Sequence, residues 1–160
     1  MQLTDEVAWS VADFAFAAAL LLGVGIPLEL AVRTTGNAAY RWAVGVALAT
    51  AFLLVWTNGA VGLIGSEDND ANALYGGVLA VGVVGALVAR ARARGMAWTM
   101  AATALAQAAV AVGALVAGLG PGGGLIEVVA LNGGFVALWA GSAALFRRAA
   151  REHPGAGAVA

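Results

Sequence analysis

Long apolar stretches, separated by short polar interruptions, make up most of this chain. They run over about residues 8–32, 40–65, 73–89, 96–119 and 125–146. A helix needs roughly 20 residues to cross the hydrocarbon core of a bilayer. The pattern therefore predicts an all-α fold, a polytopic transmembrane helix bundle with five spans. We expect a single transmembrane domain over residues 1–150 and a disordered tail over residues 151–160.

The composition agrees with a membrane environment. Of the 160 residues, 62% are hydrophobic and 11% are charged, whereas soluble domains are about 25% charged. A soluble chain of this length buries only about 70% of the surface that it exposes when unfolded, so it could not hide this much apolar surface. There is no cysteine and His153 is the single histidine, which excludes ordinary zinc and iron–sulfur sites, and we expect no metal and no cofactor.

The distribution of charge predicts an orientation. All eight basic residues are arginines, and with five spans they fall on one side of the membrane: Arg33, Arg41, Arg90, Arg92, Arg94, Arg147, Arg148 and Arg151. The positive-inside rule makes that side the cytoplasm. We therefore expect the N-terminus outside and the C-terminus in the cytoplasm. The net charge of -1 offers no basic face for nucleic acid.

Small residues and tryptophans indicate how the spans pack. In lipid, helices associate by close packing and hydrogen bonds. Small residues recur at helical spacing at Ala102, Ala106, Ala109, Gly113 and Ala117 in the fourth span, and at Gly82 and Ala86 in the third. We expect both faces to contact other helices. Trp9, Trp42 and Trp98 lie near span ends, as in an aromatic belt, whereas Trp56 and Trp139 lie deeper, where they would pack between helices or line a pocket.

Polar residues inside the spans are the candidate site. Glu29 precedes Arg33 by four residues, so the two are expected to pair, which leaves Asp13 as the intramembrane acid without an obvious partner. Asn58 and Asn132 lie in the same outer half of the membrane, and Gln107 lies near the middle of the fourth span. Thr99, Thr103 and Gln107 lie on one helix face, and Asn132 and Trp139 lie on another.

Two interpretations of these polar residues stay open. If the faces point inward, Asp13, Asn58, Gln107 and Asn132 form a polar cluster that binds a small molecule or an ion. Alternatively, the amides hydrogen-bond across helices and hold the bundle together without binding a ligand.

The loop after the second span is acidic and contains Glu67, Asp68, Asp70 and Asn72. Its alternating oxygen ligands resemble a calcium loop, but Ala73 replaces the required glycine and Leu79 stands where a glutamate belongs. An EF-hand is thereby excluded. A weak cation site remains one interpretation, and a solvated turn that caps the third helix is the other.

The segment from Asn58 to Asn69, NGAVGLIGSEDN, is similar to that of a group of small bacterial multi-pass inner-membrane proteins to which no activity is assigned. Further likeness continues through Tyr75 to Gln107. A proline often follows the Glu-Asp-Asn of that group, and Asp70 stands there in this chain. The resemblance implies a location in a bacterial inner membrane and supplies no catalytic residues.

These observations lead to two hypotheses of function. The first is an accessory or structural protein whose helices pack against another membrane protein or a second copy of the chain. The alternative is a small oligomeric transporter or channel with a proton- or cation-linked polar site in the outer half of the bundle. We do not expect an enzyme, because carboxylates and amides alone support few reactions.

Overall fold

The computed structural model of the chain describes residues 10–64, 69–119 and 125–152. Its helices are α1 (Val11–Thr34), α2 (Ala38–Val61), the 3-10 turn η1 (Asp70–Ala73), α3 (Leu74–Ala89), α4 (Ala93–Val116) and α5 (Leu125–Glu152). Five helices, α3 taken together with η1, are long and apolar enough to cross a membrane. The predicted all-α bundle with five spans is confirmed.

Local sequence explains where the helices begin and end. At the start of α1, the Ser10 side chain accepts a hydrogen bond from the Asp13 backbone while the Asp13 carboxylate accepts from the Ser10 backbone, which forms a capping box. Asn37 caps α2 through its side chain. Gly62, with a φ of 68°, ends that helix, so α2 stops short of the predicted boundary at residue 65.

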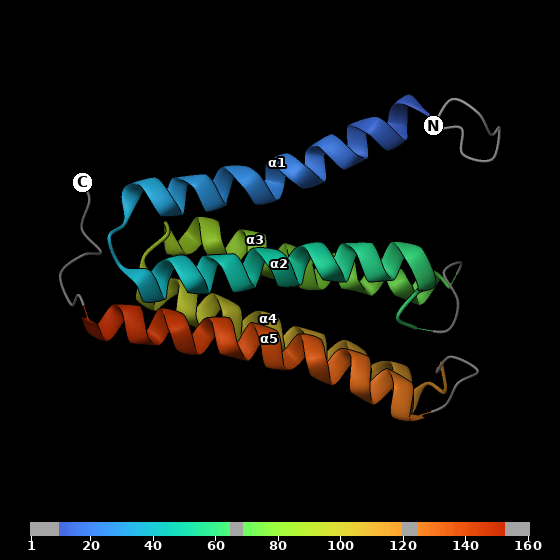
Figure 1. The fold of residues 1–160 in the computed structure, drawn as a ribbon. Coiled ribbons are helices and arrows are strands. Elements are labelled where there is room, and N and C mark those ends of the chain that lie inside the picture. Colours follow the sequence, from blue (N-terminus) through green and yellow to red (C-terminus); the bar gives the residue numbers. More distant parts are fainter. Residues whose placement is uncertain (1–9, 65–68, 120–124, 153–160) are drawn as a thin grey trace.

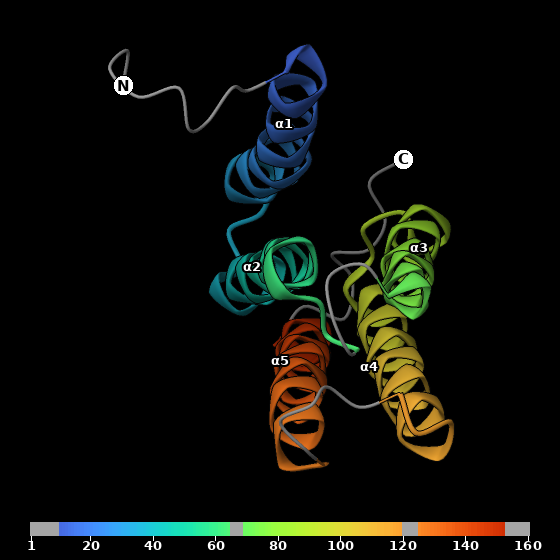
Figure 2. The same ribbon diagram turned by 90° about the vertical axis from the view of Figure 1, so that its right-hand side faces the viewer.

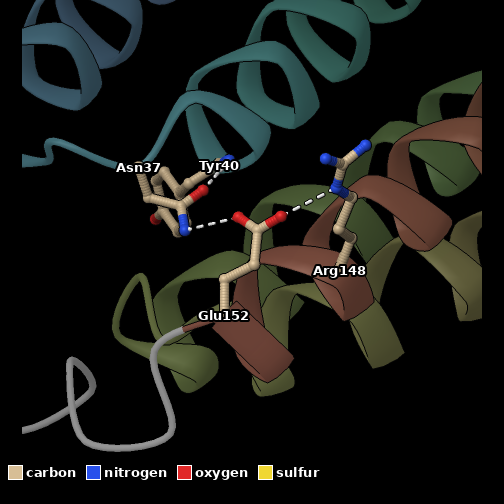
Figure 3. Close-up of polar contacts among 4 residues, drawn as sticks. All are labelled: Asn37, Tyr40, Arg148 and Glu152. Carbon is tan, nitrogen blue, oxygen red and sulfur yellow. Dashed lines mark hydrogen bonds and ion pairs between the residues drawn. The ribbon is translucent and has the colours of Figure 1, made fainter.

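The fifth helix is longer than predicted. We expected the last span to end at residue 146 and the disordered tail to begin at 151, but α5 continues to Glu152. Contacts at its end explain the extension: the Glu152 carboxylate accepts hydrogen bonds from Arg148 at 2.8 Å and from the Asn37 side chain at 3.1 Å (Figure 3). The helix therefore runs two residues past the expected boundary at 150, and the rest of the expected tail lies outside the described residues.

The helices form an antiparallel bundle in which α1 is peripheral (Figure 1). The most extensive packing joins α4 to α5, α2 to α5 and α3 to α4. Viewed along the bundle, α1 stands apart from the other four and approaches α2 at one end (Figure 2). Within its most apolar window only 6% of α1 is buried, compared with 33% for α4 and for α5. The core therefore belongs to α2 to α5, where Leu54 and Phe146 are fully buried.

Gly82 of α3 contacts α4, as the sequence predicts, and Ala86 is half-buried, but the tightest contact is at Gly85, which was not predicted. A β-carbon placed on Gly82 would lie 3.5 Å from the hydroxyl of Thr103, and one on Gly85 would lie 2.5 Å from the methyl of Thr99. The prediction for α4 is wrong for four of its five residues. Ala102, Ala109, Gly113 and Ala117 are exposed, whereas Ala106 is half-buried and packs against the core. The face of α4 that carries Thr103 and Gln107 points inward instead.

The arginine-bearing helix ends meet at one end of the bundle, where α1 joins α2 and α3 joins α4 (Figure 1). Tyr40 ties this end together, because its hydroxyl donates to the Ala91 carbonyl at 2.7 Å and its ring packs edge-on against Phe146. The predicted pair of Glu29 and Arg33 is present. We call this the arginine end. We call the opposite end, where Asp13 and Asp70 lie, the acidic end.

Candidate functional site

A buried hydrogen-bond cluster joins three helices in the half of the bundle toward the acidic end. The Tyr75 hydroxyl of α3 donates to Oδ1 of Asn132 on α5 at 2.8 Å, and Nε2 of Gln107 on α4 donates to the same oxygen at 2.9 Å. None of these three side chains is more than 1% exposed. Asn132 in turn donates from Nδ2 to the Val128 carbonyl at 3.0 Å. We call this the Tyr75–Gln107–Asn132 cluster.

Two helix faces, whose direction the sequence left open, point inward and position this cluster. Thr99, Thr103 and Gln107 are all buried on α4, and Asn132 and Trp139 are both buried on α5. The two threonine hydroxyls donate to carbonyls of their own helix, Gly95 and Thr99, at 3.1 and 2.9 Å. Both hydroxyls are therefore satisfied within α4. Of these three residues, Gln107 is the one whose side chain hydrogen-bonds to another helix.

Two buried polar atoms near the centre of α4 and α5 have no hydrogen-bond partner within the described residues. They are Oε1 of Gln107 and Nε1 of Trp139. An unmade hydrogen bond of this kind costs roughly 1–3 kcal/mol. The cluster consists of neutral amides and a phenol, so its chemistry is hydrogen bonding to neutral polar groups and not proton transfer between acids and bases.

Asn58 lies beside the cluster and not within it. Its Nδ2 donates to the Asn72 carbonyl at 3.3 Å, and its buried Oδ1 has no partner in the described chain. The side chain lines a cleft of about 520 Å³ between α1, α2 and the start of α3, together with Phe16, Asp70 and Tyr75. Tyr75 thus connects this Asn58 cleft with the buried cluster.

Asn72 does not face solvent as a cation ligand would. Its side chain is buried, and its Oδ1 accepts hydrogen bonds from the backbone amides of Leu63 and Ile64 at 3.1 and 2.9 Å. Asp70 is exposed at the start of η1. Glu67 and Asp68 lie outside the described residues. No group of three or more acidic or histidine side chains in the described ranges is placed to hold a metal.

The structure does not bring Asp13 to the other candidate residues. Its carboxylate accepts from the amide and the hydroxyl of Ser10, at 2.7 and 2.8 Å, on the exposed first turn of α1. That end of α1 diverges from the bundle (Figure 1). Asp13, for which the sequence showed no obvious partner, is thus a helix-capping residue. Its position three residues after a serine favours the capping box over a long-range contact.

Tyr75 is the member of the cluster that sequence analysis did not identify as a candidate. A signal was present, because Tyr75 is a lone tyrosine in an otherwise aliphatic helix, and a buried tyrosine hydroxyl usually finds a partner. Ser142 was missed in the same way, and its hydroxyl joins α5 to the Ala43 carbonyl of α2 at 2.8 Å.

Comparisons of the chain with protein families, with curated proteins and with solved structures found no match.

Proposed function

We propose that this chain is an accessory or structural protein of a bacterial inner membrane, and that its bundle packs against another membrane protein through α1. The observation that carries the proposal is the uneven packing of the bundle, with 6% of the α1 window buried against 33% in α4 and α5. A span that adds little to its own bundle is available to bind a neighbour.

The buried polar groups favour this role over transport. Tyr75, Gln107 and Asn132 bond to one another across helices, which is the arrangement expected of residues that hold a bundle together. The acid that a proton-linked mechanism would use, Asp13, is engaged with Ser10. Both features are explained by helix packing and helix capping, without a transported ligand.

The outward face of α1 suits a helical partner. Ala15, Ala19 and Gly23 follow one another at intervals of four residues and are exposed, and a β-carbon on Gly23 would meet nothing within 4 Å. Ala17 and Val24 lie on the other side and are half-buried. Small residues in such a row allow a second helix to approach closely.

Cysteine crosslinking tests the proposal directly, because the chain has no cysteine of its own. We expect Ala19→Cys to give covalent adducts with one other membrane protein or a second copy in native membranes. Val84→Cys on α3, where the side chain is 58% exposed, is the matched control and should give none. Equal adducts from both positions, or a monomer without adducts from any α1 position, would contradict the proposal.

One observation favours a small transporter or channel as a second candidate. The Asn58 cleft combines an unpartnered buried acceptor, Oδ1 of Asn58, with the nearby Asp70 carboxylate, and so offers a polar solute or cation two oxygen ligands. Flux measured in liposomes tests this function, with Asn58→Leu expected to abolish it and Asp13→Asn expected to leave it unchanged. Absence of flux for the parent chain would remove this candidate.

We further propose that the arginine end lies in the cytoplasm, with the N-terminus outside. The support is the positive-inside rule applied to a bundle in which the arginine-bearing helix ends meet at one end.

A further inference from the structure

A groove at the arginine end lies between the start of α4 and the end of α5. It has a volume of about 510 Å³, and its lining consists of Arg94, Ala97, Trp98, Arg147, Ala150 and Arg151. We call it the arginine groove. Three cationic side chains from two helices therefore surround one concave surface.

Within the part of the chain that the structure describes, no ion pair neutralises the three arginines of this groove. Arg33 and Arg148 each pair with a glutamate four residues away. Within the described ranges, no such pair involves Arg94, Arg147 or Arg151. Like charges gathered in one groove repel one another, and an anion bound among them would relieve that repulsion.

Arg147 is held in place by an aromatic ring. Its guanidinium carbon lies 5.6 Å from the centre of the Trp98 ring, a cation–π contact. The Trp98 side chain is 67% exposed at the wall of the groove. Because the ring orients the guanidinium without neutralising it, Arg147 keeps its hydrogen-bond donors for a ligand.

The length of α5, its arginines and the position of Trp98 favour a location of the groove at the depth of lipid headgroups. With 28 residues, α5 is about 42 Å long at 1.5 Å per residue, whereas the hydrocarbon core is about 30 Å thick. At least one end of α5 therefore extends beyond the hydrocarbon, and the charges of Arg147 and Arg151 favour the end that carries them, because a charge inside the hydrocarbon is costly. Trp98 fits the same level, since tryptophan is enriched at membrane interfaces.

An apolar strip runs from the groove along the outside of α4. Trp98, Leu105 and Val112 follow at intervals of seven residues, hence on one face, and are 67%, 71% and 58% exposed. A soluble anion would make no use of this strip. The acyl chain of a lipid whose headgroup sits in the groove would lie against it.

We propose that the arginine groove binds the phosphate of an anionic phospholipid. Planar guanidinium groups donate paired hydrogen bonds to phosphate oxygens, and three of them from two helices recognise a headgroup with net negative charge over a zwitterionic one. The inference stands independently of the accessory role.

Lipid retention by the full-length protein tests this site. The purified chain is titrated with phosphatidylglycerol, with phosphatidylcholine and with inorganic phosphate, and bound lipid is counted by native mass spectrometry. We expect phosphatidylglycerol to bind more tightly than phosphatidylcholine, and inorganic phosphate to displace it poorly. Each of Arg94→Gln, Arg147→Gln and Arg151→Gln should weaken phosphatidylglycerol binding about fivefold.

Arg90→Gln is the matched control, because it removes the same charge from the same end but not from the groove, and it should leave binding within about twofold of the parent. Arg147→Lys keeps the charge and loses the planar fork, so an intermediate affinity is expected. Equal losses for Arg90→Gln and the groove variants, equal binding of both lipids, or displacement by inorganic phosphate as effective as by lipid would each overturn the proposal.

Discussion

Gln107 donates a hydrogen bond from Nε2 to Oδ1 of Asn132 at 2.9 Å, and so links α4 to α5 through two fully buried amides. Tyr75 donates to the same oxygen from α3. Three helices therefore meet at one acceptor, and the contribution of each pair to the stability of the bundle is measurable by double-mutant cycles.

A double-mutant cycle on Gln107→Leu and Asn132→Leu should show that the two residues are coupled. We expect a coupling energy of about 0.6–1.7 kcal/mol, the range for hydrogen bonds between membrane helices, in unfolding by sodium dodecyl sulfate. A cycle between Gln107→Leu and Ser142→Ala is the control, since Ser142 bonds to Ala43 of a different helix, and it should be additive. Zero coupling in the first cycle would show that the bond contributes no net stability.

The contact of Gly85 with Thr99 should tolerate no added methyl group. We expect Gly85→Ala to destabilise the bundle by about 1–3 kcal/mol, because its β-carbon would lie 2.5 Å from the Thr99 methyl and 3.1 Å from the Thr99 β-carbon. Gly77→Ala, where nothing lies within 4 Å, should be neutral or slightly stabilising. The additional change Thr99→Ala should restore part of the loss, and a Gly85→Ala variant as stable as Gly77→Ala would mean that the helices separate freely.

Asn72 should stabilise the fold through its acceptor oxygen and should not bind a cation. Asn72→Leu leaves the buried amides of Leu63 and Ile64 without their acceptor, at a cost of roughly 1–3 kcal/mol for each amide. Asn72→Asp retains an acceptor and should lose less. Hydrogen exchange of these two amides should accelerate in Asn72→Leu, and added calcium should leave the stability of the parent chain unchanged.

Truncation of a leucine should destabilise the protein more in the packed bundle than in the peripheral helix α1. Leu54 is completely buried in α2, whereas Leu22 in α1 is 58% exposed. We expect Leu54→Ala to cost about 2 kcal/mol or more and Leu22→Ala to stay within about 0.5 kcal/mol of the parent. Similar losses at both positions, measured by the same unfolding assay, would mean that α1 contributes to the core as fully as α2.

The orientation of the bundle in the membrane can be measured by labelling single introduced cysteines, again because the chain has no cysteine of its own. In intact spheroplasts a membrane-impermeant maleimide should label Ser10→Cys at the acidic end. Arg90→Cys at the arginine end should react only in inverted vesicles or after permeabilisation. The reverse pattern would place the arginine end outside.

Several features of the bundle follow from residues and their spacing alone. The number of apolar helices and the pairing of Glu29 with Arg33 were predicted correctly, whereas the direction of the faces that carry Gln107 and Asn132 was left open. Each depends on local properties: the length of an apolar run, or the separation of two residues on one helix.

The tertiary structure alone decided which helix faces meet. Asp13, Asn58, Gln107 and Asn132 are all polar residues in apolar spans, yet two of them bond to each other, Asn58 faces a cleft and Asp13 caps its helix. The exposed alanines of α4 likewise show that small residues at helical spacing do not by themselves identify a contact face. In a membrane an apolar face packs against lipid as readily as against protein, so hydrophobicity does not mark the contact face, and the choice rests on shape and hydrogen bonds between residues distant in the chain.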